Sequence, residues 1–179
     1  MGIGHRPCVG LATVYAWDSA TVYAWDSATV YATPYVVVHL HSAKARVSGG
    51  HIIDVADLDL SDPATWCEHH GVTVVDGIAT VYKAVDNHWT TSRGIDYSPG
   101  STPSAPDWRA DGRRGGGLHF SPTPWLSQTY YPEATRYVSC GVSIETLMPI
   151  LGAGAAKCKA PAVVRGCVEV DIDGREVVR

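Results

Sequence analysis

An eight-residue unit repeats near the start of the chain: ATVYAWDS at 12–19, ATVYAWDS at 20–27 and ATVYATPY at 28–35. A period of eight keeps no apolar stripe on a helix, whereas periods of seven or eleven do. Small apolar side chains alternate with Thr, Tyr and Trp inside each unit, and a period of two is typical of a strand. Asp18-Ser19 and Asp26-Ser27 are turn residues. The chain therefore opens with short strands separated by turns.

Repeated strand-and-turn units fit either a meander of hairpins or a small β-solenoid. We favour the solenoid, because Val and Ala side chains suit a narrow interior and two units of eight residues would make one coil. Stacked coils would place Thr on Thr and Tyr on Tyr. The repeat fades through 36–51, and we expect Ser48-Gly49-Gly50 to break it. We expect His51 to Val55 to be the last strand of the stack.

The outward side of these strands would carry a row of aromatic side chains. Such a row is either a flat binding face, for sugar or for another protein, or a surface that packs on the rest of the chain or on a second copy of it. The predicted binding residues are Tyr15, Trp17, Tyr23, Trp25 and, in a later Gly- and Pro-rich loop, Trp108.

After the repeat, short helices alternate with strands. We expect a β-repeat module at 1–60 and an α+β domain with an antiparallel sheet at 61–179, so the protein is mainly β. Asp62-Pro63 and Thr123-Pro124 combine an N-cap residue with a proline at the first helical position, and each predicts a helix start. Ser143 predicts a third helix, which Pro149 would end.

The strands of the second domain follow from alternation and turn residues. Val72 to Val75, Asp76-Gly77 and Ile78 to Val85 predict a tight hairpin, since Asp-Gly supplies the positive φ angles of a two-residue turn. Further strands are expected at 117–121, 136–142, 158–164 and 167–172. A long loop at 87–117 is of the kind that is usually functional or mobile.

Composition and charge indicate which binding partners and which cellular compartment to expect. The net charge of −4 argues against nucleic acid as the main partner. Five cysteines without a CxxC motif indicate reduced thiols in a cytoplasmic protein. The sequence shows no signal peptide and no membrane-spanning segment. Cys67 to His70 lack the spacing of a zinc site and the acidic stretch at 54–62 lacks the Gly and Glu of an EF-hand, so we expect no metal.

Short motifs occur throughout the second part of the chain: Trp66-Cys67-Glu68, Gly71-Val72, Tyr82-Lys83-Ala84-Val85-Asp86, Tyr97-Ser98-Pro99-Gly100, Gly117-Leu118-His119-Phe120-Ser121, Lys157-Cys158-Lys159-Ala160 and Val168-Glu169-Val170-Asp171. Together they resemble an uncharacterised protein family of actinobacteria and their phages, which carries a domain of unknown function of the DUF7666 type. Relatives also carry ATV-x-A-x-DS repeats ahead of that domain. The resemblance implies a family and leaves the activity open.

The order of parts more distantly resembles the ADP-ribosyltransferases. This likeness implies a cleft for NAD lined by Tyr82, His119 and Ser121, with the loop at 87–117 as its lid. The catalytic candidates are Tyr82, Lys83, His119, Ser121 and Glu145. Lys83 stands where those enzymes have Arg or His, and the chain has no Glu-x-Glu motif. Glu145 is also explained by the dipole of the helix expected there, and His119 by a structural hydrogen bond.

Two functions follow from these observations. The first is a non-enzymatic binding or assembly protein, without a cofactor, that self-associates or binds a protein partner through the β-repeat. The alternative is a nucleotide-handling enzyme with an ADP-ribosyltransferase-like C-terminal domain. We favour the first, because a near-identical repeat is an unusual framework for catalysis.

Overall fold

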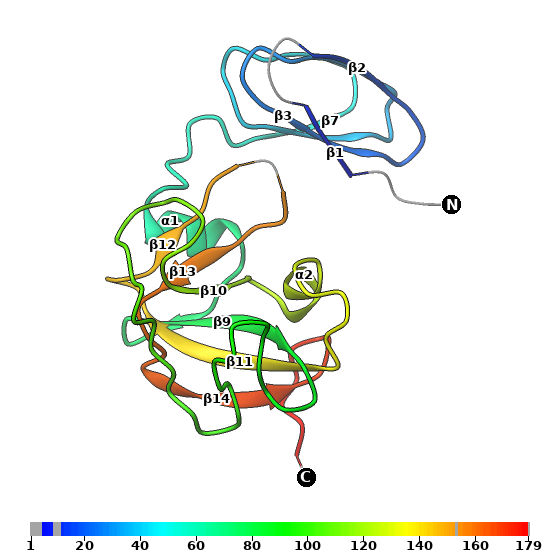
Figure 1. Ribbon diagram of the computed structural model, residues 1–179. Coiled ribbons are helices and arrows are strands. Elements are labelled where there is room, and N and C mark those ends of the chain that lie inside the picture. Colours follow the sequence, from blue (N-terminus) through cyan, green and yellow to red (C-terminus); the bar gives the residue numbers. More distant parts are fainter. Residues whose placement is uncertain (1–4, 9–11, 153, 179) are drawn as a thin grey trace. The chain divides into compact units, whose positions relative to one another are not determined.

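The computed structural model describes residues 5–8, 12–152 and 154–178. The chain forms two compact units, Met1–Leu58 and Asp59–Arg179 (Figure 1).

The first unit is a parallel β-solenoid. It contains β1 (His5–Cys8), β2 (Thr13–Ala16), β3 (Thr21–Ala24), β4 (Thr29–Ala32), β5 (Val37–Leu40), β6 (Arg46–Ser48) and β7 (His51–Asp54). Alternate strands pair, so one sheet has the order β1-β3-β5-β7 and the other β2-β4-β6. Figure 1 shows the coils as flattened rings in blue to cyan. The solenoid prediction is confirmed, because one coil takes two of the eight-residue units.

The register of the strands places like residues on like. Thr13 pairs with Thr29 in β2 and β4, and Tyr15 pairs with Tyr31. The two tyrosine rings stack with their centroids 5.1 Å apart. In the other sheet Tyr23 pairs with His39, because the repeat has diverged by that point. The predicted ladder of identical residues is therefore confirmed between β2 and β4.

Small apolar side chains fill the interior of the solenoid. Val22, Ala24 and Val30 are at most 2% exposed, and Val36 and Val38 are fully buried. These are the positions that alternate with Thr and Tyr in the sequence. The narrow interior explains why the repeat uses Val and Ala, since a larger side chain would need space that the two sheets do not leave.

The eight-residue period ends around Ser48-Gly49-Gly50, as expected, because Thr29 pairs with Arg46 and Val37 with His51, while the stack itself continues through these residues. Ser48 ends β6, and the two glycines make the turn into β7 with φ angles of +80° and +78°. A Cβ atom on Gly49 would lie 2.2 Å from the carbonyl oxygen of Ala32. Glycine permits both the left-handed backbone and this close approach. The expectation that His51 begins the last strand of the stack is confirmed.

The second unit contains two antiparallel sheets. Its strands are β8 (Val74–Val75), β9 (Ile78–Val85), β10 (Leu118–Phe120), β11 (Arg136–Ser143), β12 (Met148–Pro149), β13 (Cys158–Ala160) and β14 (Arg165–Val170). The larger sheet has the order β14-β11-β9-β8 and the smaller one β10-β13-β12. The predicted α+β architecture with an antiparallel sheet is confirmed. The Asp76-Gly77 hairpin is confirmed too, with φ angles of 52° and 73°.

Two of the three predicted helices are present. In α1 (Pro63–His69) the Asp62 carboxylate accepts a hydrogen bond from the Thr65 amide at 2.8 Å. In α2 (Pro124–Gln128) the Thr123 hydroxyl accepts one from the Leu126 amide at 3.1 Å. These side chains satisfy amides that the first helical turn leaves without a partner.

The third predicted helix, after Ser143, is wrong. Ser143 is the last residue of β11, and residues 144–146 form a turn. Met148 and Pro149 then form β12, which pairs with Lys159 and Cys158 of β13. The pairing with a distant strand prevails over the local capping signal, as tertiary contacts often do over helix propensity.

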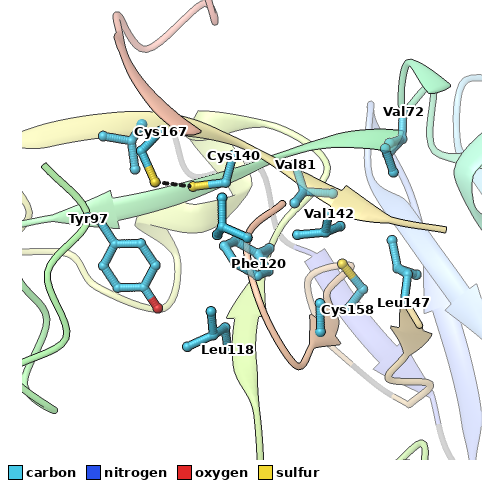
Figure 2. Close-up of a cluster of buried hydrophobic side chains, with 14 of the residues drawn as sticks. Val72, Val81, Tyr97, Leu118, Phe120, Cys140, Val142, Leu147, Cys158 and Cys167 are labelled. Carbon is cyan, nitrogen blue, oxygen red and sulfur yellow. Dashed lines mark hydrogen bonds between the residues drawn. The ribbon is translucent and has the colours of Figure 1, made fainter. Parts of the chain in front are cut away.

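The core of the second unit lies between its strands and α1. Figure 2 shows part of it, with Val81, Val142, Leu147 and Phe120 packed together. The Sγ atoms of Cys140 and Cys167 lie 3.1 Å apart as free thiols. Along the described chain, no helix has the length and apolarity needed to cross a bilayer.

Candidate functional site

The second unit has a cleft of about 450 Å³ beside the point where its two sheets meet. At that point Tyr82 of β9 and Ser121, next to β10, exchange backbone hydrogen bonds of 2.8 and 2.9 Å. Beyond this bridge the two sheets have separate strand orders, and the cleft lies between their strands, the loop at 91–97 and the segment at 127–133.

Charged, polar and aromatic side chains line the cleft. Its lining residues are Tyr82, Lys83, Ala84, Thr91, Ser92, Arg93, Ile95, Tyr97, Gly117, Leu118, His119, Phe120, Ser121, Ser127, Tyr130, Tyr131, Pro132, Glu133 and Lys157. Four of the five predicted catalytic residues are in this set. The long loop contributes one wall of the cleft through residues 91–97.

Lys83 projects from β9 into the cleft. Its ammonium group donates a hydrogen bond of 2.6 Å to the carbonyl oxygen of His119. It also lies 5.4 Å from the ring centre of Tyr97 and 5.7 Å from that of Phe120. Burial lowers the pKa of Lys83 to about 8, and the charge of Arg93 acts in the same direction. The described residues give this ammonium no carboxylate within ion-pair distance.

His119 projects from the face of β10 opposite the buried Leu118 and Phe120. Its Nε2 atom is buried and has no hydrogen-bond partner among the described residues. Burial, together with the charge of Lys83, lowers the pKa of His119 to about 4, while the interaction with the Gly115 backbone acts in the opposite sense. The imidazole is therefore neutral at pH 7.

Two more cations complete the polar part of the cleft. The ammonium of Lys157 lies 4.3 Å from the ring centre of Tyr130, and burial lowers the pKa of Lys157. Arg93 forms an exposed ion pair of 3.3 Å with Asp107. Glu133 is the single carboxylate in the lining, which otherwise carries positive charge.

The side chains of Tyr82 and Lys83 point in different directions. Neighbouring side chains of a strand point to opposite faces, and a Cβ atom on Gly174 would lie 3.3 Å from the Tyr82 hydroxyl. The ring of Tyr82 therefore extends toward the turn at Gly174, where a second, smaller cavity also contacts it. The requirement that Tyr82, His119 and Ser121 present their side chains together is not met.

Glu145 lies apart from the cleft. It is exposed in the turn between β11 and β12 and is absent from the lining. Its expected place in the first turn of a helix is wrong, because that helix does not form. An acid that steadies positive charge in the cleft would have to be Glu133, which the sequence did not single out.

Trp108 packs inside the second unit. Its ring lies 5.6 Å from the ammonium of the fully buried Lys159, and a Cβ atom on Gly117 would lie 2.9 Å from it. Trp108 is half-buried and does not line the cleft. These contacts are structural ones, between the Gly-rich loop and β13.

The aromatic residues of the repeat divide between the two sheets of the solenoid. Tyr15 and Trp17, in and after β2, are 66% and 63% exposed. Tyr23 and Trp25, in and after β3, are half-buried. Trp25 stacks on His41 with ring centres 4.0 Å apart. Consecutive units belong to different sheets, so these four residues form two surfaces. The exposed aromatic residues of the repeat are the stacked Tyr15 and Tyr31, together with Trp17 after β2 and Tyr35 after β4.

Sequence reasoning missed Arg93 and Lys157. They stand far apart in the chain, on a loop and beside β13, and no spacing motif connects them to Lys83. Only the folded arrangement brings the three cations to one cleft. The structure also shows no group of three or more His, Cys, Asp or Glu side chains placed to hold a metal ion, within the described ranges.

The fold and the cleft together define a parallel β-solenoid followed by an α+β domain with a cationic cleft. The domain family described as "Domain of unknown function (DUF7666)" matches residues 79–172, more than half of the chain. The protein belongs to this family, and the match includes β9 from its second residue, all strands from β10 to β14 and every residue of the cleft lining. No curated protein and no solved structure matches the chain.

Proposed function

We propose that this is a non-enzymatic binding and assembly protein whose β-repeat associates with a second copy of the chain. The observation that carries the proposal is the stacked pair Tyr15–Tyr31, which is exposed at 66% and 46%. Trp17, after β2, and Tyr35, after β4, are also exposed, at 63% and 83%. An apolar surface of this kind on a folded protein marks an interaction site by default.

A second copy is the occupant that the geometry favours. In a two-fold dimer each subunit contributes the same surface, so the surface must complement itself. Flat rings in a regular ladder do so, because offset stacking of ring on ring is favourable in either direction. The edge of β2 strengthens the argument. Among the described residues β2 pairs only with β4, and an unpaired strand edge is a template for pairing with another chain.

The arrangement of the cleft supports a binding role over an ADP-ribosyltransferase reaction. Such a reaction needs groups that grip the nicotinamide and a carboxylate near the reacting carbon. The ring of Tyr82 points toward Gly174, and Glu145 is in another part of the domain. We therefore propose no cofactor for the protein.

The thiols support action in a reducing compartment such as the cytoplasm. The chain has five cysteines, an odd number, with no CxxC motif, and Cys67, Cys140, Cys158 and Cys167 are buried. Structural disulfides are typical of oxidising compartments. The ATV-x-A-x-DS repeats ahead of the family domain support an actinobacterial or phage origin.

Sedimentation velocity of the full chain over a range of concentrations tests the proposed assembly. We expect wild type to form a dimer below about 0.5 mM, the weak end of specific association. Tyr15→Thr combined with Trp17→Ser should shift the dimer toward monomer by at least about tenfold in Kd. Trp125→Ser is the matched control, because Trp125 is also a 57% exposed aromatic residue but lies on α2. A wild-type chain that stays monomeric throughout, or a loss of dimer in the Trp125 variant alone, would overturn the proposal.

A further inference from the structure

The cleft of the second unit brings together three cations, two of which have no carboxylate within ion-pair distance among the described residues. Lys83, Arg93 and Lys157 all line it, and Glu133 is the one acidic residue in the lining. Arg93 has an exposed partner in Asp107, but the described residues place no carboxylate within ion-pair distance of Lys83 or Lys157. The charges of all three cations lower the pKa of His119, which shows that their fields meet at the imidazole.

Keeping these cations together costs free energy. A buried charge loses hydration, and like charges repel more strongly where water is excluded. Lys83 is compensated in part by the His119 carbonyl oxygen and by the faces of Tyr97 and Phe120. A bound anion would supply the missing charge, and charge-assisted hydrogen bonds from lysine and arginine are among the stronger polar interactions in proteins.

We propose that this cleft binds a small phosphate monoester, with the phosphate held by Lys83, Arg93 and Lys157 and a neighbouring hydroxyl group of the ligand donating to His119. A phosphate monoester is favoured over a carboxylate because a dianion matches a site of three cations more closely. The volume of about 450 Å³ is in the range of small-molecule sites.

The buried Nε2 atom of His119 provides a second contact for the ligand, in addition to the cations that hold its phosphate. In the neutral ring one nitrogen donates a hydrogen bond and the other accepts one. Nε2 is buried and has no hydrogen-bond partner among the described residues, and the proposed tautomer has Nε2 as the acceptor. A ligand that places a hydroxyl group there would satisfy a buried polar atom that otherwise has no hydrogen bond.

Binding is measured by titrating the full chain with glycerol phosphate at constant ionic strength, following by NMR the backbone amide signals of the residues that line the cleft, which wild type and His119→Leu share. We expect saturation with a Kd of about 1 mM or below. Methyl phosphate lacks the hydroxyl and should bind more weakly, and His119→Leu should remove that difference. The proposal is overturned if no saturation occurs up to about 50 mM, or if lactate, a hydroxy monocarboxylate, binds more tightly than glycerol phosphate.

Variants that each remove one positive charge test which residues bind the phosphate. Arg93→Gln alters a 54% exposed side chain and should leave the fold intact, yet it should weaken glycerol phosphate binding by about tenfold. Lys157→Gln should act in the same direction. Arg175→Gln is the matched control, because Arg175 is 76% exposed and does not line the cleft. Equal effects of Arg93→Gln and Arg175→Gln would show that binding follows net charge alone, and would overturn the assignment.

Discussion

The ammonium of Lys159 lies 2.7 Å from a carboxylate oxygen of Asp111, and the two side chains differ sharply in burial. Lys159 is fully buried in β13, whereas Asp111 is 43% exposed in the Gly-rich loop. The same ammonium donates a hydrogen bond of 3.0 Å to the carbonyl oxygen of Gly115. This ion pair fastens the loop at 107–117 over the small sheet, next to the strand that carries His119.

The difference in burial predicts unequal effects of removing either partner. Asp111→Ala leaves the buried ammonium group of Lys159 without its carboxylate partner, which is strongly destabilising. Lys159→Met instead leaves the carboxylate of Asp111, which water can reach. We expect Lys159→Met to lower the free energy of unfolding by about 1 kcal/mol, the net contribution of its hydrogen bond to Gly115, and Asp111→Ala to lower it by more. Urea unfolding at pH 7 measures both. A larger loss in Lys159→Met would contradict this account.

Lys83 predicts a rise of stability in alkaline solution. Burial lowers its pKa from 10.5 to about 8, so between these values the unfolded chain binds more protons than the native one. Stability must then increase with pH in that window, by about 3 kcal/mol for a shift of this size. Burial raises the pKa of Tyr97, which opposes the trend above pH 10. The measurement is therefore the difference between wild type and Lys83→Met, and a difference that is constant from pH 8 to 10.5 would refute it.

His119 predicts a loss of stability in acidic solution. Its pKa is lowered from 6.5 to about 4, so the native chain binds fewer protons than the unfolded one between these values. The stability from the neutral imidazole is complete above pH 6.5 and is lost as the pH falls toward 4. The His119 ring signal in NMR should titrate below pH 5. A His119 midpoint above pH 6 would contradict the buried, cation-flanked site.

Gly49 predicts a sharp steric limit in the solenoid. Gly49→Ala places a Cβ atom 2.2 Å from the Ala32 carbonyl oxygen on a backbone with φ of +80°. The left-handed backbone alone costs about 1 kcal/mol, and the clash adds to it, so we expect a loss of more than about 2 kcal/mol in the first unit. Gly77→Ala is the control, since its φ is +73° but no atom lies within 4 Å. Thermal unfolding followed by circular dichroism compares the two, and equal losses would exclude the clash.

Local chemistry accounts for the elements that the sequence predicted correctly. The repeat has a period of eight with inner alternation of two, and two such units close one coil, so Tyr15 meets Tyr31. Asp62 and Thr123 cap their helices through amides three residues along the chain. Asp76-Gly77 turns a hairpin whose strands are adjacent in sequence. Each of these signals depends on residues that are close together in the sequence, or on the short repeat that closes one coil of the solenoid.

Tertiary structure decided the rest. The helix expected after Ser143 gave way to β12, because Met148 and Pro149 pair with a strand about ten residues further on. The cationic cleft joins Lys83, Arg93 and Lys157, and the direction of Tyr82 was set by contact with Gly174. The sequence alone determined the coils, caps and turns, since they depend on periodicity and near neighbours. The site depended on long-range sheet pairing, which brings distant side chains together without leaving a spacing pattern in the chain.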